Sequence, residues 1–343
     1  MGDQKLFGWL RMVGGVRYEN NISDVNVNNG GTRLRGAGSN NPLAGLPTTG
    51  GYDVEDWYPS ASLIADVTDS WKFRVAYSET LALPSAREVS PYASTRFSGA
   101  GVDVGNSNLE PSEVESFDFG VNYANEQGDS IGLTFFHKKV AGRIEKLNGL
   151  YIDQPAIPVQ TTSPGAGGAL YSWYNNPSEA RLNGLEFEAR KNLGFLGSFF
   201  EPFSVGGNYT LIDGEVERFP IEVSRKQGVG RPVSDMRSLT EQPEYIVNFD
   251  LSYDNEEKGL KVAFIYYMIS DVLESVSLQD SYDRYRKGYD TLDFTISQTF
   301  AEHWKLSFSA KNLLNTEKQA YYDVEGREVI SDSYRTGISY SIG

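Results

Sequence analysis

Apolar and polar residues alternate along much of the chain, and the clearest example lies between Tyr289 and Asn315. Two apolar series in this stretch, Leu292, Phe294, Ile296 and Trp304, Leu306, Phe308, Ala310, are interleaved with charged and hydroxyl-bearing residues. Successive side chains of a β-strand point to opposite faces, so each series predicts a strand with one apolar and one polar face. Because only about residues 300–303 separate the two series, the stretch predicts a β-hairpin.

The same alternation predicts about twelve strands in the whole chain. Besides the hairpin, the expected strands are roughly Phe7–Asn20, Trp57–Val67, Trp71–Leu81, Phe117–Tyr123, Ile131–Lys146, Leu185–Ala189, Phe203–Ile212, Tyr245–Tyr253, Leu260–Met268 and Tyr334–Ile342. Short polar turns, such as residues 125–129, alternate along the chain with long loops, such as residues 83–111. In an antiparallel meander this alternation places all the short turns at one end of the sheet and all the long loops at the other.

This layout is typical of a bacterial outer-membrane barrel, which has short periplasmic turns, long extracellular loops, apolar residues toward lipid and polar residues toward the lumen. Aromatic residues near the expected strand ends match the girdles of such barrels: Trp57, Tyr58, Trp71, Tyr123, Tyr253, Trp304 and Tyr340. We therefore expect an all-β, antiparallel up-and-down transmembrane β-barrel. A soluble β-sandwich or propeller is the alternative, but its strands are typically only about 5–6 residues long.

Composition narrows the possible functions. The net charge of −15 argues against a nucleic-acid partner, because phosphate backbones are bound by an excess of Lys and Arg. The absence of cysteine excludes disulfides, Cys-ligated zinc and a thiol nucleophile. No run of about 18 apolar residues is present, which excludes a transmembrane helix, whereas a transmembrane strand needs only about 9–11 alternating residues. We expect no cofactor and no metal site.

Residues able to carry catalysis are few. The chain has two histidines: His303 lies in an expected turn, and His137 lies on an expected strand without an Asp or Asn partner at a recognisable spacing. Glu186, Glu188 and Arg190 share one strand face, as do Asp118, Asp250 and Asp293 on theirs. Such charged rows are typical of the polar, water-filled interior of a barrel, where the side chains pair with charges on neighbouring strands. This interpretation is favoured over a catalytic acid–base pair. We therefore expect no enzymatic activity.

Five segments resemble recurring patterns of a known family, and they occur in that family's order. They are GVRYE at residues 15–19, YSETLALPSAREVSPY at 77–92, GNSNLEPSEVESFDFGVNY at 105–123, ARLNGLEFEARKNL at 180–193 and FSAKNLLNTEKQAYY at 308–322. Together they resemble the C-terminal part of the β-barrel of TonB-dependent outer-membrane receptors. The sequences of these segments are similar to those of the carbohydrate-associated group of the family from Caulobacter- and Xanthomonas-like bacteria.

The resemblance implies substrate-specific active uptake across the outer membrane of a Gram-negative bacterium, energised by the TonB complex. It implies that residues 1–343 form the C-terminal portion of a larger barrel, with no plug domain among them. The implied partners are outer-membrane lipid, a small nutrient such as an oligosaccharide or a siderophore-like compound, and TonB acting through the absent plug. A self-contained passive pore or a structural barrel is the alternative function.

Ligand recognition in such a barrel would come from the long loops and the upper inner wall, where aromatic rings stack on sugars and guanidinium groups hold carboxylates or phosphates. The candidate ligand-binding residues are Arg87, Tyr92, Arg96, Phe97, Trp173, Tyr174, Tyr282, Arg284, Tyr285 and Arg286. The motif GNSNLEP precedes an expected strand, whereas phosphate-binding glycine loops open a helix. We therefore expect Gly105 and Asn106 to form a turn.

Overall fold

The computed structural model describes residues 1–26, 49–90, 93–95, 102–148, 170–228, 230–277, 282–300 and 303–343, which form two β-sheets. The larger sheet has 14 strands, and all of them pair antiparallel with their neighbours. Thirteen strands follow one another across the sheet, and the fourteenth, β13, pairs with β12 outside this order. In order across the sheet these are β1 (Gly2–Lys5), β2 (Leu10–Asn26), β3 (Thr49–Asp66), β4 (Trp71–Ala82), β7 (Ser112–Ala124), β8 (Ser130–Ala141), β11 (Ala180–Asn192), β12 (Phe203–Glu217), β14 (Tyr245–Asn255), β15 (Leu260–Ile269), β18 (Tyr289–Phe300), β19 (Trp304–Lys311) and β22 (Ser339–Ile342), with β13 (Met236–Ser238) beside β12.

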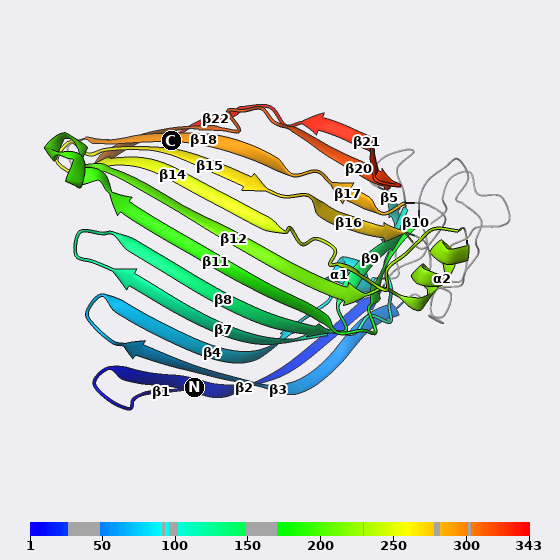
Figure 1. Ribbon diagram of the computed structural model, residues 1–343. Helices are drawn as coiled ribbons and strands as arrows, with labels where there is room; N and C mark the ends of the chain where they lie inside the picture. The colour runs from blue at the N-terminus through cyan, green and yellow to red at the C-terminus, as the bar shows by residue number, and fades with distance from the viewer. Residues whose placement is uncertain are drawn as a thin grey trace.

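The large sheet curves into a wall whose tight turns all lie at one end, on the left of Figure 1, and whose long connections all lie at the other. We call these the short-turn end and the long-loop end. In the described part of the chain no ladder joins β1 to β22, so the wall has these two strands at its edges. The arrangement confirms the predicted antiparallel meander and the alternation of its connections.

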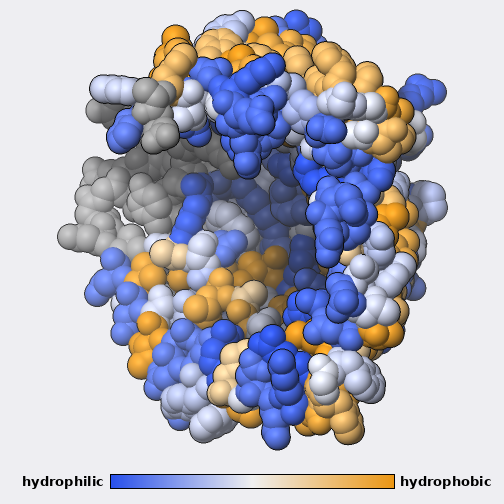
Figure 2. Space-filling view, turned by 90° about the vertical axis from the view of Figure 1, so that its left-hand side faces the viewer, coloured by the Kyte–Doolittle hydropathy of each residue, from blue (hydrophilic) through white to orange (hydrophobic). Residues whose placement is uncertain are grey.

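The two faces of the wall differ as the alternation predicts. On β14, Phe249 is 50% exposed on the outer face, whereas its neighbour Asn248 points inward and donates to Asn208 of β12. Seen from the short-turn end, the molecule is hollow, with hydrophilic residues along much of the hollow and hydrophobic groups on the outside (Figure 2). A sheet that exposes its apolar face cannot be a soluble sandwich, which would bury that face in a core.

Aromatic pairs mark both borders of the apolar outer band. Trp71 meets Tyr123 and Phe203 meets Tyr253 near the short-turn end, and Tyr18 meets Trp57 and Tyr209 meets Tyr245 toward the long-loop end. Tyr245 and Tyr253 stand at the two ends of β14, which at about 3.3 Å per residue are roughly 26 Å apart along the strand. This separation matches the apolar band of about 25 Å in outer-membrane barrels.

The smaller sheet lies at the long-loop end and was not expected from the sequence. Its eight strands are, in order, β21 (Arg327–Arg335), β20 (Glu317–Val324), β17 (Arg284–Arg286), β16 (Val272–Ser277), β9 (Ile144–Asn148), β10 (Leu170–Asn175), β6 (Val102–Val104) and β5 (Ala93–Thr95). The helical elements are α1 (Ala86–Val89), α2 (Pro220–Gly228), η1 (Leu193–Leu196) and η2 (Ser198–Phe200). None of the helices in the described ranges is long and apolar enough to cross a membrane.

Three details of the expected strand pattern were wrong. The expected strand Ile131–Lys146 is divided at residues 142–143 into β8 of the wall and β9 of the small sheet. Residues 316–332 were expected to form a loop and 334–342 one strand, but β20 and β21 form a hairpin there and only β22 joins the wall. The first strand was expected at Phe7–Asn20, whereas β1 and β2 form a hairpin that turns at residues 6–9. Short strands such as β1 lack enough alternating positions to stand out from a polar loop.

The small sheet carries one of the packed cores of the described residues, and Val140, Ala180, Val216 and Leu239 form another where it meets the wall. It brings β9 and β16 together in parallel, although their continuations β8 and β15 are separated in the wall by three strands, β11, β12 and β14. Leu147, Tyr174, Leu273 and Val276 of this sheet pack with Phe219, which precedes α2. We call the small sheet together with residues 218–239 the cap.

A candidate ligand-binding surface at the long-loop end

The segment GNSNLEP is a rigid turn that positions part of the cap, as expected. Asn106 is fully buried; its backbone N–H donates to the Glu88 carbonyl at 2.7 Å, and its side-chain amide donates to the Trp173 carbonyl at 3.0 Å. A Cβ at Gly105 would lie 1.8 Å from the Ser90 carbonyl oxygen, so only glycine fits there. The turn therefore links the chain around α1 to β10.

Helix α1 is fixed by a capping box that is readable in the sequence as Ser85-x-x-Glu88. The Ser85 hydroxyl accepts from the Glu88 N–H, and the Glu88 carboxylate accepts from the Ser85 N–H at 2.7 Å. This geometry holds Arg87 over the small sheet. The Arg87 guanidinium donates to the Asp103 carboxylate at 2.6 Å and lies 6.0 Å from the ring centre of Trp173.

Lys146 completes a group of charges and aromatic rings on this face of the cap. Its ammonium lies 2.7 Å from the Asp103 carboxylate, 4.9 Å from the centre of the Tyr171 ring and 5.2 Å from that of Trp173. Both rings are partly exposed, and burial raises the pKa of Tyr171 to about 12. We call Arg87, Asp103, Lys146, Tyr171 and Trp173 the ring cluster.

The third group of candidates lies on β17 and just before it. Arg284 pairs with Glu274 of β16 and with Asp332 of β21, and Arg286 donates to Glu241 at 2.8 Å. The Arg231 guanidinium stacks 3.8 Å from the centre of the Tyr282 ring. The guanidinium groups at positions 284 and 286, like that of Arg87, are therefore neutralised by carboxylates of the chain itself.

Two candidates belong to the packing of the cap, one of them fully buried and the other partly buried. Tyr174 is fully buried in the cap, and Tyr285 packs against the same cluster and stacks on Tyr321 at 5.4 Å between ring centres. Burial raises the pKa of Tyr285 to about 12 and also raises that of Tyr321, whose hydroxyl donates to Asp271 at 2.6 Å. The candidates Tyr92, Arg96 and Phe97 lie outside the described residues.

Sequence reasoning missed Asp103, Lys146 and Tyr171. Tyr171 and Trp173 stand two residues apart in LYSWYN and therefore share a strand face, which was a readable signal. Lys146 and Asp103 carried no such signal. They reach the rings only because β10 pairs with β9 on one side and with β6 on the other.

Beneath the small sheet lies a buried network of ion pairs. Arg237 of β13 binds Glu145 of β9 through both terminal nitrogens and also reaches Glu222 of α2 at 3.4 Å. Lys226 bridges Glu222 at 3.3 Å and Asp283 at 2.8 Å. Burial would raise the pKa of Glu145, but Arg237 and the Asn176 amide outweigh it, so the pKa is lowered. Because each charge has opposite partners, the network fixes the cap without leaving an isolated ion.

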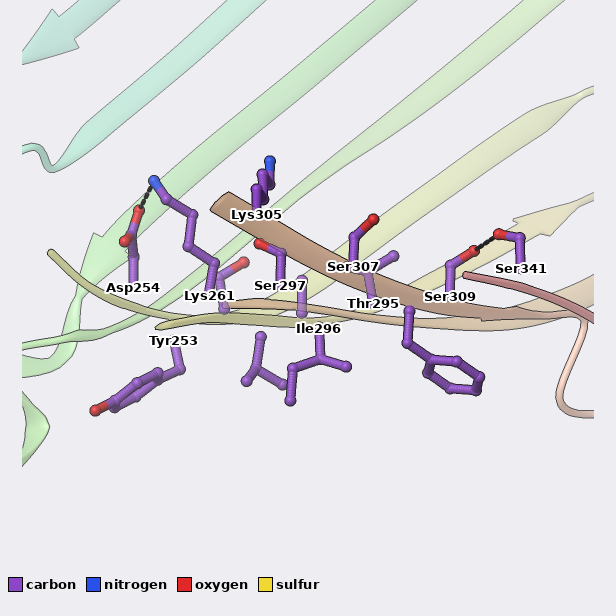
Figure 3. A pocket seen from close by; sticks show the side chains of 14 residues that line it. Tyr253, Asp254, Lys261, Thr295, Ile296, Ser297, Lys305, Ser307, Ser309 and Ser341 are labelled. Carbon is purple, nitrogen blue, oxygen red and sulfur yellow. Dashed lines mark hydrogen bonds and ion pairs between the residues drawn. The ribbon is translucent and has the colours of Figure 1, made fainter. Parts of the chain in front are cut away.

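The inner wall carries the predicted charge pairs and a hydroxyl-lined pocket near the short-turn end. Arg190 of β11 donates to Asp250 of β14 at 2.9 Å, a cross-strand pair of the expected kind. In Figure 3 the hydroxyl-bearing residues of the pocket stand on the same side of the sheet as Lys261 and Lys305, and Tyr253 and Ile296 point to the opposite side. The hydroxyl-bearing residues are Thr295, Ser297, Ser307, Ser309 and Ser341. Lys261 pairs with Asp254 at 2.6 Å. The inner wall is thus polar.

His137 does find a partner that its sequence spacing did not reveal. Its Nδ1 lies 2.8 Å from Oδ1 of Asn183 on the neighbouring strand. The residues facing His137 across its two ladders are Phe117 and Asn183, and neither is a nucleophile.

Comparison with solved structures gives the same architecture. The ferric-catecholate import receptor Fiu of E. coli K12 has a TM-score of 0.55 and 14% identity, covering 92% of this chain and 40% of that one. A ferric enterobactin receptor mutant from Pseudomonas aeruginosa, in complex with enterobactin, has a TM-score of 0.56 and 16% identity, covering 98% and 43%. The copper transporter OprC has a TM-score of 0.58 and 15% identity, covering 92% and 41%. The chain thus spans about two fifths of the length of these structures.

One curated protein also matches in sequence. The mitochondrial isocitrate dehydrogenase [NAD(+)] 1 of Phaeodactylum tricornutum is 24% identical over 169 residues, which is 48% of this chain and 29% of that protein. A match of this extent and identity covers only part of either protein and places the chain in no enzyme family. The architecture described above is the wall of a β-barrel.

The β-barrel family described as TonB dependent receptor-like matches residues 3–313, which leave out only the last strand of the wall, β22, and the last two strands of the small sheet, β20 and β21. Members of this family lie in the outer membrane of Gram-negative bacteria. The lipid-facing apolar band, the polar lumen and the separation of short turns from long loops all agree with that location. The chain belongs to the TonB-dependent receptor family and forms part of the β-barrel of such a receptor.

Proposed function

We propose that the protein is a receptor for substrate-specific active uptake across the outer membrane, energised by the TonB complex. In this proposal residues 1–343 form the C-terminal portion of the barrel, and the rest of a larger receptor supplies the plug on which TonB acts. The proposal is supported by the family match and by a chain that spans about two fifths of related solved receptors. The single observation that carries it is the cap, because a folded unit over the long-loop end gives a pore a place to select its cargo.

The ring cluster is the part of the cap best suited to touch cargo. Tyr171 and Trp173 present partly exposed rings, and Arg87, 54% exposed at its side chain, lies beside them. Aromatic faces next to hydrogen-bond donors recognise sugars and other ring-bearing solutes. Tyr282, Arg284 and Arg286 form the next candidates, and Tyr92, Arg96 and Phe97 follow Arg87 in the chain.

Charge favours a neutral cargo over an anionic chelate. The arginines of the candidate set that the structure describes already bind carboxylates of this chain: Arg87 with Asp103, Arg284 with Glu274, and Arg286 with Glu241. Binding an anion there would require breaking these pairs, whereas stacking a sugar on Trp173 would not. We therefore propose an oligosaccharide as cargo, in keeping with the carbohydrate-associated group of the family, and a siderophore-like compound as the competitor.

Uptake by cells tests the proposed function. Cells that make the full-length receptor should accumulate labelled maltodextrin-type oligosaccharides when TonB is present and stop doing so when TonB is deleted. Uptake that persists without TonB would contradict active transport and support a passive pore. Uptake of a ferric catecholate, and of no oligosaccharide, would keep the transport mechanism and overturn the proposed cargo.

The ring cluster is tested by binding to the purified receptor. Trp173→Ala should weaken oligosaccharide binding several-fold, because it removes an aromatic stacking contact worth about 0.5–1.5 kcal/mol. Trp304→Ala is the matched control, since Trp304 is 75% exposed at the opposite end of the wall. Equal affinity of the two variants would place the binding site elsewhere.

A further inference from the structure

The connection between β11 and β12 differs from the polar turns at the short-turn end and resembles the turn between β1 and β2, which exposes Phe7 (62%) and Trp9 (53%). The turns at residues 68–70, 125–129 and 256–259 are short and polar. In contrast, residues 193–202 contain η1 and η2 and expose large apolar side chains: Phe195 (68%), Leu196 (56%), Phe199 (75%) and Phe200 (37%). In Figure 1 the two short helical turns stand out at the short-turn end of the wall. An exposed apolar cluster of this kind marks an interaction surface.

Hydrogen bonds hold this connection in a defined shape. The Asn192 side chain accepts from the Gly194 N–H at 2.7 Å and donates to the Glu201 carbonyl at 2.9 Å, so it closes the connection at both ends. The Asn192 N–H in turn donates to Asp129 in the neighbouring turn at 2.9 Å. The apolar side chains are therefore presented outward by an ordered backbone.

The exposed side chains continue the lipid-facing surface of the barrel. Phe199 and Phe200 each lie 6.0 Å from Phe203, and Phe203 meets Tyr253 at 4.9 Å, all between ring centres. Phe203 and Tyr253 belong to the outer face, in the same strand parity as Phe249. The aromatic surface thus runs without a break from the transmembrane band onto the connection.

A cationic group stands at the border of this surface. The Lys191 ammonium lies 5.2 Å from the centre of the Phe195 ring and pairs with Asp129, and the Lys191 side chain is 51% exposed. Apolar rings beside a lysine form the composition by which segments lie in a membrane interface, with the rings among acyl chains and the amine at the headgroups. A water-facing turn needs none of these features.

We propose that residues 193–203 form a membrane anchor that inserts Phe195, Leu196, Phe199 and Phe200 into the phospholipid leaflet at the short-turn end. The occupant is lipid because the surface is continuous with the band that lipid already covers and lies at its border. In outer-membrane barrels the short turns face the periplasm, so this leaflet is the periplasmic one. The anchor would set the depth of β11 and β12 in the bilayer, independently of which cargo the receptor takes.

Cysteine labelling tests the anchor directly, because residues 1–343 contain no cysteine. Phe199→Cys in the full-length receptor is labelled with an environment-sensitive dye and reconstituted into vesicles of phosphatidylethanolamine and phosphatidylglycerol. Gln127→Cys, in the polar turn between β7 and β8, carries the same dye as the matched control. We expect brominated acyl chains to quench the dye at position 199 several-fold more than at position 127, and aqueous iodide to show the reverse order.

Two outcomes would overturn the proposal. Equal iodide quenching at positions 199 and 127 would place the connection in water. Protection of position 199 from iodide without quenching by brominated lipid would mean that protein, such as a second copy of the receptor, covers the surface instead. Heat-modifiable migration on gels checks that each variant is folded, and Phe195→Cys, on the same connection, replaces Phe199→Cys if that variant does not fold.

Discussion

Arg237 of β13 holds Glu145 of β9 with both of its terminal nitrogens, at 2.9 Å and 2.6 Å, across 92 residues of sequence. The side chains of both residues are almost completely buried, with 2% and 0% exposed. The pair ties the small sheet to the segment that connects β12 with β14. The cap therefore depends on a contact between the connection from β8 to β11 and the connection from β12 to β14.

Removing the arginine should loosen the cap and leave the wall intact. Arg237→Gln leaves the carboxylates of Glu145 and Glu222 buried with too few cations, and breaking a buried pair in this way costs about 3–5 kcal/mol. We expect hydrogen exchange at the β9 amides to accelerate by about 10²–10³-fold, while that of β14 stays unchanged. Arg335→Gln, which removes the exposed pair with Glu317, is the control and should leave β9 exchange as it is.

Acid should weaken the same contact. The pKa of Glu145 in the folded protein is below its ordinary value of 4.5, so its pairing stabilises the cap fully above that pH and loses this contribution as the pH falls below it. The fluorescence of Trp173, taken as the difference from a Trp173→Phe variant, should change through this acid range. Glu145→Gln should be insensitive there, and an identical acid transition in that variant would show that another group is responsible.

The turn at Gly105 should tolerate no side chain. In Gly105→Ala the new Cβ would meet the carbonyl oxygens of Ser90 and Arg87 at 1.8 Å and 2.8 Å, and backbone atoms cannot rotate away. We expect the turn to shift and the Asn106 bond to Trp173 to break, seen as a red-shifted Trp173 emission and weaker cargo binding. Gly8→Ala is the control because its Cβ would meet nothing within 4 Å.

Adjacent residues of β18 should respond oppositely to a charge. Phe294 belongs to the lipid-facing series, with its ring 4.9 Å from that of Phe264, whereas Thr295 stands among the hydroxyls of the inner wall (Figure 3). Phe294→Arg should therefore destabilise the barrel by about 2–4 kcal/mol, and Thr295→Arg should cost much less. Urea unfolding from vesicles measures both. A larger loss for Thr295→Arg would reverse the assignment of the two faces.

Much of the wall could be predicted because its signal is local. Leu292, Phe294 and Ile296 alternate with polar neighbours, and this period of two sets the faces of a strand whatever its partners are. The same holds for β14 and β15, whose apolar series were read directly, and for the alternation of short and long connections. The capping box of α1 and the turn at Asn106 were also local patterns.

What the sequence by itself determined is therefore most strands of the wall, their two faces and the end at which the loops gather. Only the tertiary structure decided what those loops do. It pairs β9 with β16 in parallel, buries Tyr174, packs the partly buried Tyr285 against it, and brings Lys146 close to the rings of both Tyr171 and Trp173. These contacts join segments far apart in sequence, and the local sequence of one segment does not indicate which other segment it will contact. The face to which each side chain of a strand points follows from neighbouring residues, whereas a buried pair such as Arg237 and Glu145 exists only once the whole cap has folded.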